Sequence, residues 1–402
     1  MIAKMRITQG FLGLIVLAGV LQISRPVEAA STTIFDRQAL ERWSGTFSTE
    51  AASVDVTAIV LGLENPWGMS FLPDGTILLT ERPGRLRLAR NAELGPPIAG
   101  VPDVYNVGQG GLLDVALDPD FADNRLIYLS FAEPGEGGAG TAVMRARLTR
   151  DGLAGRLDRQ EVIFRENIKT PNNLQFGSRL TFAPDGTLFV TLGDRGAKDR
   201  AQDKRDLAGS VVRIRPDGSI PEDNPFLDDP GARPELWSIG HRNPQGAAIH
   251  PQTGRYWTVE HGARGGDELN RPEAGKNYGW PEISYGRHYS GLKIGRGTRA
   301  AGFEQPVYYW DPSIAPSGLA IYGQNGVAGW RGNAFVGALK DELIARLEID
   351  VTGPVAKVRH EEQWDMSRWG RIRDVDVDAD GNIWFLTDER NGGLFKISPD
   401  RR

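Results

Sequence analysis

One pattern recurs along the chain: a short apolar strand, a turn rich in Pro, Asp and Gly, and a second short strand. Asp and Gly favour such turns because Asp bonds nearby backbone and Gly adopts positive φ. Six copies can be recognised, the fifth with a longer connection, and their starts are separated by roughly 45 to 70 residues. They cover residues 67–80, 112–131, 179–192, 247–259, 318–338 and 373–387.

A unit of this size cannot bury its apolar face alone, so successive units must pack against one another. Six such units in a chain of 402 residues with 50 glycines predict an all-β fold, a six-bladed β-propeller over residues 53–402. A pair of β-sandwiches, or an irregular β protein, is the alternative. In a propeller the loops of all blades gather around one axial mouth, so residues far apart in sequence can form one site.

The first 29 residues have the pattern of a secretory signal peptide. Lys4 and Arg6 precede an apolar run from about Phe11 to Ile23, and small residues follow at 29 and 30. The run is shorter than the roughly 20 residues that span a bilayer. We therefore expect a periplasmic or secreted protein without stable membrane insertion.

Two further segments can be assigned from local composition. Residues 30–52 are expected to form an N-terminal leader segment that wraps the first blade, with a short helix over 36–43. The glycine-rich segment 133–140 is expected to be a mobile loop.

Composition excludes two classes of chemistry. The chain has no cysteine, hence no disulfide and no thiolate chemistry. Its formal charge of −5 argues against nucleic acid as a partner, since nucleic acid requires basic surface. A monomer or a homodimer is expected.

Residues 240–280 carry the densest polar pattern. Two polar clusters flank a short hairpin, whose strands are expected over 247–249 and 256–259. The first cluster contains Arg242 and Asn243, and the second contains Gly262, Ala263 and Glu268. Glu268 and the carbonyls of the other two supply oxygen donors, as Ca²⁺ requires. The pattern favours an anion held beside a hard cation, and a surface salt-bridge cluster is the alternative.

Two more segments place amides and a carboxylate near the mouth. Gln109 lies in a glycine-rich stretch that allows a ligand to approach the backbone, although such a stretch is also an ordinary turn. Gln175 and Asp194 bracket one hairpin and should lie at the same end of it. Asp194 could orient a neighbour or accept a proton, or it could only form an Asx-turn.

Cationic residues from separate repeats complete the set. Arg371 and Arg373 alternate along a strand and so point to one face, where they repel each other unless an anion lies between them or water screens them. With Lys340 and Arg242 they make four cations from three blades, and a small polyanion in the mouth would explain all four.

From about Leu63 to Ile397 the chain resembles the soluble quinoprotein sugar dehydrogenases, and among them the aldose sugar dehydrogenases. The markers occur in the same order as in that family: GQGGLLDVALDPDF at 108–121, FGSRLTFAPDGTLFVTLGDRG at 176–196, GHRNPQG at 240–246, GGDELN at 265–270, NYGWP at 277–281, DPSIAPSG at 311–318, VGALK at 336–340 and RIRDVDVDADG at 371–381.

The resemblance implies an enzyme that oxidises aldose sugars with pyrroloquinoline quinone (PQQ) and Ca²⁺, and that passes electrons to an acceptor the sequence does not identify. It assigns PQQ contacts to Gln109, Arg242, Asn243, Tyr289, Lys340, Arg371 and Arg373. It places the catalytic Ca²⁺ on the carbonyls of Gly262 and Ala263, where the family usually has Pro in place of Ala263, and a structural Ca²⁺ on Glu268 and Tyr278.

The chain departs from the family at the general base. The family has a His nineteen residues before the Asp that corresponds to Asp194, and this chain has Gln175 there. A neutral amide has no useful basicity near pH 7. Asp194 could act directly or through a water, one of His241, His261 or His288 could replace the missing base, or the chain could have kept the cofactor site and lost fast turnover.

Three functions therefore compete. The first is a PQQ-dependent sugar dehydrogenase. The second is a propeller that binds PQQ or carbohydrate with little or no turnover. The third is a Ca²⁺-dependent hydrolase such as a lactonase, against which the four converging cations argue because it needs an axial metal held by carboxylates.

Overall fold

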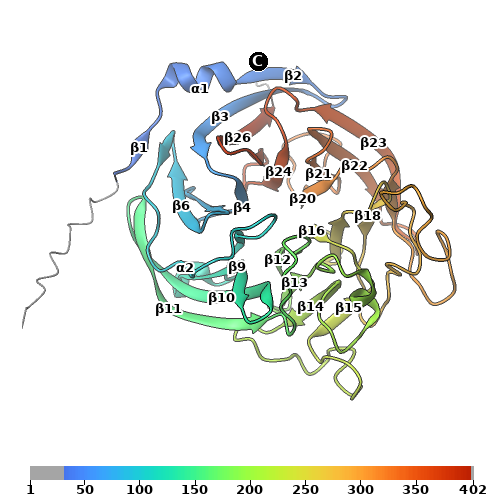
Figure 1. Ribbon diagram of the computed structural model, residues 1–402. Helices are drawn as coiled ribbons and strands as arrows, with labels where there is room; N and C mark the ends of the chain where they lie inside the picture. Colours follow the sequence, from blue (N-terminus) through green and yellow to red (C-terminus); the bar gives the residue numbers. More distant parts are fainter. Residues whose placement is uncertain (1–30, 400–402) are drawn as a thin grey trace, which may run out of the picture. The chain divides into compact units, whose positions relative to one another are not determined.

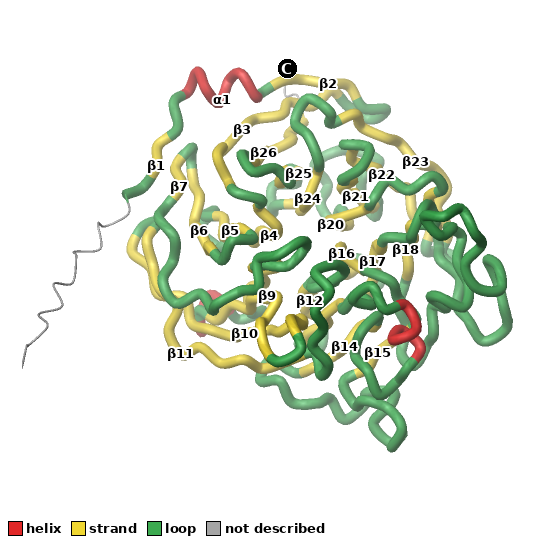
Figure 2. Tube along the Cα trace, viewed as in Figure 1, coloured by secondary structure: helices red, strands yellow, loops and turns green. Residues whose placement is uncertain are grey.

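The computed structural model describes residues 31–399, and the predicted signal peptide lies outside the described residues. Six antiparallel sheets surround a central axis (Figure 1), which confirms the predicted six-bladed β-propeller. In each blade one strand lies innermost, next to the axis, and the strands that follow it in the chain lie successively outwards (Figure 2). In the last blade, two strands from early in the chain form the outer edge. No helix within residues 31–399 is both long and apolar enough to span a membrane.

The first three blades contain the following strands: β4 (Pro66–Phe71), β5 (Ile77–Glu81), β6 (Arg85–Arg90) and β7 (Glu93–Leu94) in blade 1; β8 (Leu112–Leu117), β9 (Leu126–Gly135), β10 (Gly138–Asp151) and β11 (Ala154–Arg165) in blade 2; β12 (Leu180–Phe182), β13 (Leu188–Thr191), β14 (Ser210–Ile214) and β15 (Leu236–Ile239) in blade 3.

The remaining blades contain these strands: β16 (Pro244–Ile249), β17 (Tyr256–Glu260), β18 (Asp267–Asn270) and β19 (Tyr308–Trp310) in blade 4; β20 (Pro316–Ile321), β21 (Ala334–Ala338), β22 (Leu343–Asp350) and β23 (Lys357–Asp365) in blade 5; β24 (Ile372–Val377), β25 (Ile383–Thr387), β26 (Gly392–Pro399), β3 (Ser53–Leu63) and β2 (Gly45–Ser48) in blade 6.

The ring is closed by strands from both ends of the chain. β3 pairs with β26, so one sheet contains residues from near the start and near the end of the chain. β1 (Thr33–Ile34) pairs with β7 in blade 1, and β2 pairs with β3 in blade 6. The helix α1 (Arg37–Trp43) lies between them, close to the predicted span. Residues 33–48 therefore contact the first and the last blade, not the first alone.

Turn chemistry explains the hairpins. Asp74 accepts a hydrogen bond from the Thr76 N–H, and Asp185 accepts one from the Thr187 N–H at 3.0 Å. The glycine between each pair, Gly75 or Gly186, has φ near +80°. The same Asx-turn with a left-handed glycine thus repeats in two blades, and it leaves the apolar residues of each hairpin to pack between neighbouring sheets.

One sequence prediction of local structure is wrong. Residues 133–140 do not form a loop, because β9 and β10 pair continuously as far as Gly135 and Gly138. Lys169 Nζ donates to Glu133 at 2.6 Å, and Ala139 exchanges backbone hydrogen bonds with Thr170. These contacts hold the glycine-rich segment as the end of a strand pair.

Ion pairs join the inner strands across the axis. Arg179, beside β12, contacts Asp114 on β8 at 3.0 Å and Asp374 on β24 at 2.8 Å, and all three are buried. Removing one partner of a buried ion pair costs about 3–5 kcal/mol because it leaves a charge uncompensated. This cluster therefore fixes the relative positions of three blades below the mouth.

Candidate active site

The predicted site residues lie at the end of the blades where inner strands begin. Gln175 precedes β12 and Asp194 follows β13, so both lie at the same end of one hairpin, as expected. The backbones there are so close that a side chain at Gly193 would overlap the carbonyl of Gln175. Glycine is thus required at Gly193 for the two segments to approach.

Gln109 supports the backbone of Gln175. Its Oε1 accepts the Gln175 N–H at 2.7 Å, and Gln175 adopts the left-handed conformation with φ 57°. The Gln175 side chain is buried, and its Oε1 has no hydrogen-bond partner within residues 31–399. Leaving a buried acceptor unpaired costs about 1–3 kcal/mol, so this oxygen lowers the stability of the folded protein.

Asp194 is a buried carboxylate held from two sides. Trp280 Nε1 donates to Oδ2 at 2.8 Å, and the Gly196 N–H donates to Oδ1 at 2.8 Å. Burial raises the pKa of Asp194 above its ordinary value, while the nearby Arg242 guanidinium lowers it in part. The role of Trp280 has no local sequence signal, because Trp280 lies 86 residues from Asp194 and contacts it only in the folded chain.

Arg242 and Asn243 extend from the loop before β16. The Arg242 guanidinium donates to the carbonyls of His261, at 3.2 Å, and Gly262. Its Cζ also lies 5.4 Å from the centre of the Trp280 ring, and a cation in that place is attracted by the indole. Asn243 Oδ1 accepts the Gly177 N–H at 3.0 Å. Arg242 and Trp280 together form one wall beside Asp194.

Arg371 and Arg373 both contact an anion, which is the carboxylate of Asp388 in the same chain. Asp388 Oδ2 lies 2.7 Å from Arg373 Nη2 and 3.6 Å from Arg371 Nη2. The Arg373 guanidinium holds the pKa of Asp388 below its ordinary value. Arg373 is buried, whereas the side chain of Arg371 is 43% exposed. The pair therefore does not by itself require an external anion, although Arg371 keeps donors free.

Lys340 and Tyr289 line a cavity of about 680 Å³, together with Gly262 and Ala263. Lys340 Nζ donates to the Ser313 carbonyl at 2.8 Å and contacts Asp341 at 3.0 Å. Tyr289 is 75% exposed. Four of the predicted cofactor or metal residues thus come together around one opening.

The three histidines considered as replacement bases differ in their burial and in their hydrogen bonds. His241 is fully buried, with Nδ1 2.8 Å from Glu260 and Nε2 2.9 Å from Ser238, so it does not reach the mouth. His261 lines the cavity, and burial with the charges of Arg242 and Arg373 lowers its pKa to about 3. His261 Nε2 has no partner within the described part of the chain. His288 lies on the hairpin at the cavity rim.

Glu268 and Tyr278 line a second, small pocket behind Arg242 and Trp280. Glu268 accepts one hydrogen bond, from Asn270 at 3.0 Å. Burial and the neighbouring carboxylate of Glu260 raise the pKa of Glu268 well above its ordinary value. A carboxylate that is hard to ionise without a counter-charge is suited to a cation, and Ca²⁺ prefers such oxygen donors.

Protein carboxylates alone do not form a metal centre. Within residues 31–399 there is no group of three or more His, Asp or Glu side chains with metal-binding geometry. At Gly262 the carbonyl already accepts from Arg242, and a carbonyl oxygen can accept a second partner. The donor set around Gly262 and Ala263 therefore fits an ion whose remaining ligands come from a bound molecule.

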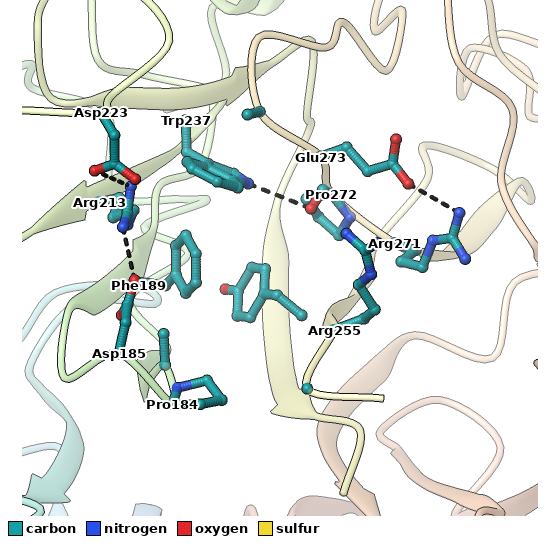
Figure 3. A pocket seen from close by; sticks show the side chains of 14 residues that line it. Pro184, Asp185, Phe189, Arg213, Asp223, Trp237, Arg255, Arg271, Pro272 and Glu273 are labelled. Atoms are coloured by element: carbon teal, nitrogen blue, oxygen red, sulfur yellow. Dashed lines mark hydrogen bonds and ion pairs between the residues drawn. The ribbon is translucent and has the colours of Figure 1, made fainter. Parts of the chain in front are cut away.

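Another cavity, of about 670 Å³, lies at the opposite end of blades 3 and 4, beside the turn between β12 and β13 (Figure 3). Its Arg213 is already paired with Asp185 and Asp223, and lies 5.1 Å from the Trp237 ring. None of the sequence-predicted site residues lines it. The mouth is therefore the candidate active site.

Comparison with known proteins agrees with this geometry. Residues 63–396 match the family model described as Glucose / Sorbosone dehydrogenase. The aldose sugar dehydrogenase YliI of Escherichia coli K12 is 45% identical over 353 residues, which cover 87% of this chain and 94% of that protein.

Solved structures give the same result. A crystal structure of a glucose dehydrogenase has 49% identity and a TM-score of 0.82, covering 85% of this chain and 98% of the other. The PQQ-bound aldose sugar dehydrogenase of Streptomyces coelicolor has 27% identity and a TM-score of 0.71, covering 86% of this chain and 99% of the other. The chain therefore belongs to the glucose/sorbosone dehydrogenase family, a family of sugar dehydrogenases.

Proposed function

We propose that this chain oxidises the C1 hydroxyl of an aldose to the lactone, with PQQ as redox cofactor and Ca²⁺ beside it, in the periplasm or after secretion. The observation that carries the proposal is the approach of three cations from three blades. Lys340 lines the cavity, and Arg371 donates to the carbonyl of the adjacent Leu339. Arg242 donates to the Gly262 carbonyl of the same cavity and lies near the buried Asp194. Electrons would then pass to an acceptor that the chain itself does not identify, and the protein would act as a monomer or homodimer.

When bound, PQQ would supply the hydride acceptor, and Ca²⁺ would polarise the accepting carbonyl as a Lewis acid. The residues present fit such a group. Lys340, Arg242 and Arg371 offer charged donors to carboxylates, and Gln109 and Asn243 offer amides beside them. The unpartnered Nε2 of His261 faces the same region of positive charge, and an anion placed there would relieve the repulsion among these cations.

Proton removal falls to Asp194. It would accept the proton of the C1 hydroxyl directly or through a water beside Gln175, because the Gln175 amide has no basicity at neutral pH. Burial raises the pKa of Asp194 toward the working pH, which strengthens it as a base. Trp280 and the Gly196 N–H keep its carboxylate oriented. His261 is the alternative base, and its lowered pKa weakens that role.

Changing Lys340 to Ala is expected to weaken PQQ binding roughly ten- to hundredfold, because a charged hydrogen bond contributes about 1.5–3 kcal/mol. Arg371→Ala should act in the same direction. The measurement is a calorimetric titration of PQQ into the Ca²⁺-saturated protein. Arg331→Ala is the matched control, since Arg331 lies in the same blade as Lys340 but in the connection at the opposite end. Unchanged PQQ affinity in both Lys340→Ala and Arg371→Ala would refute the assignment of these cations to cofactor binding.

Calcium is expected to raise the thermal unfolding temperature, and the rise should disappear in Glu268→Gln. The pKa of Glu268 is raised in the folded protein, so the metal-free protein loses stability as pH increases from the ordinary Glu value through the raised one. A cation in the pocket offsets this loss, by about 2.7 kcal/mol at 100 times its Kd. Calorimetry at pH 8 with and without Ca²⁺ tests this. An equal calcium effect in Glu268→Gln and in the nearby control Glu273→Gln would exclude the site.

A second function is favoured by one observation, the absence of a base at Gln175. A propeller that binds PQQ or carbohydrate with little turnover would keep the cations and lose the base. Reconstitution with PQQ and Ca²⁺ distinguishes the two functions. Reduction of a dye by aldoses supports the dehydrogenase, whereas uptake of PQQ without dye reduction supports the binding protein.

A further inference from the structure

Three cationic side chains lie next to one another at the rim of the mouth. The backbones of Arg264 and Arg287 exchange two hydrogen bonds, of 3.0 and 3.2 Å, in an antiparallel bridge, and Arg287 forms a second bridge with Lys293. Residues directly opposite each other in antiparallel pairs project their side chains to the same face, about 5 Å apart at Cβ. The three side chains therefore share one face.

No acidic side chain within residues 31–399 forms an ion pair with Arg264, Arg287 or Lys293. The nearby ion pairs are Lys276–Glu304 and Arg296–Glu282, and neither Arg264 nor Arg287 enters an ion pair or a side-chain hydrogen bond within residues 31–399. Residues 283–303 contain four Lys or Arg and no Asp or Glu. Like charges directly opposite each other are destabilising, so the arrangement is not explained by stability.

The row borders the cavity of about 680 Å³ that Lys340 and Gly262 also line. Arg264 and Arg287 are exposed side chains in its wall. Asp311 is the one acidic side chain among the residues lining this cavity, and it makes no ion pair within the described residues. Lys340 Nζ already contacts Asp341 and the Ser313 carbonyl, whereas Arg264 and Arg287 make no side-chain hydrogen bond within residues 31–399. Among the cations that line the cavity, the two arginines therefore have all their donors free.

We propose that Arg264 and Arg287 form an anion subsite for the substrate, which would be an aldose with a carboxylate or phosphate at the end away from C1. The inference rests on the proposed sugar oxidation and specifies its substrate class. Paired guanidiniums bind either group through several parallel hydrogen bonds. Tyr289, on the hairpin between Arg287 and Lys293, offers an aromatic surface for the apolar face of a sugar ring. The anionic end would be held at the rim, with C1 toward Gly262 and Lys340.

Binding to the cofactor-free protein tests the subsite independently of redox chemistry. Glucuronate, glucose 6-phosphate and glucose are titrated separately by calorimetry at low salt. At least one anionic sugar should bind about tenfold or more tightly than glucose, and the two anionic sugars distinguish carboxylate from phosphate recognition. Arg264→Gln and Arg287→Gln should each abolish the difference. Arg299→Gln, a charge-matched change in the same loop, should leave it intact. Equal binding of all three sugars by the unaltered protein would overturn the proposal.

Steady-state kinetics then distinguish loss of the substrate subsite from damage to the cofactor site. In the PQQ-loaded enzyme, Arg264→Gln should lower kcat/KM for the preferred anionic sugar by about tenfold or more and leave that for glucose unchanged, with normal PQQ uptake by absorbance. Weakened PQQ uptake with an equal loss for all sugars would show that the arginines bind the cofactor, and would overturn the subsite while the dehydrogenase function stands. Absence of PQQ uptake by the unaltered protein would refute the proposed function, whereas the binding preference would still be decided by calorimetry.

Discussion

Gln175→His is expected to raise kcat for aldose oxidation by at least about tenfold, since a positioned general base contributes roughly 10²–10⁴-fold. The position can accept the change. Gln175 has φ 57°, and His is among the residues enriched in that left-handed region. The Gln109 Oε1 accepts its hydrogen bond from the backbone N–H of residue 175, so this bond is retained in the variant. The amide oxygen that would be lost has no hydrogen-bond partner within residues 31–399.

Steady-state kinetics of the reconstituted enzyme test this prediction, with Gln175→Met as the control. Methionine removes the amide without adding a base, so it should give no gain. The His variant should also acquire an acid limb near the ordinary imidazole pKa of about 6.5. A rapid unaltered enzyme that gains nothing from His would show that another residue already accepts the proton.

The fold was predictable because its signals are local. The turns at Asp74 and Asp185 each have their own Asx hydrogen bond and left-handed glycine, and the apolar strands on each side are short and regular. The segment 133–140 was mispredicted because composition alone ignores pairing. Its glycines lie in a strand pair held by Lys169 and by the backbone of Thr170.

The site was only partly predictable. The order of the sequence motifs predicted that Lys340, Gly262 and Tyr289 belong to one site, and all three line one cavity. Asp388 was missed, although it follows β25 and so lies beside the start of β24, where it separates Arg371 from Arg373. Contacts between blades carry no local signal at all. The bond from Trp280 to Asp194 joins loops of two blades, 86 residues apart in the sequence. The bridge between Arg264 and Arg287 joins two irregular loops of one blade, which also have no periodic pattern.

Asp194→Asn is expected to lower kcat/KM roughly 10²–10⁴-fold, the range for loss of a positioned base. An amide cannot accept the substrate proton, yet its oxygen can still accept the hydrogen bond from Gly196, so the loop should keep its shape. PQQ uptake should therefore be close to that of the unaltered protein. Unchanged kcat/KM would assign the proton to another group. His261, which like Asp194 lies near Arg242, would be the first to change.

The pH profile identifies Asp194 more specifically than the loss of rate does. Only ionised Asp194 can accept a proton, so the rate should fall as pH decreases through its pKa, which burial places above the ordinary value of about 3.9. Trp280→Phe removes the indole donor that stabilises the ionised form. That change should therefore move the acid limb to higher pH with a smaller loss of maximal rate than Asp194→Asn. A limb that stays in place in Trp280→Phe would mean that the titrating group is not the carboxylate that Trp280 contacts.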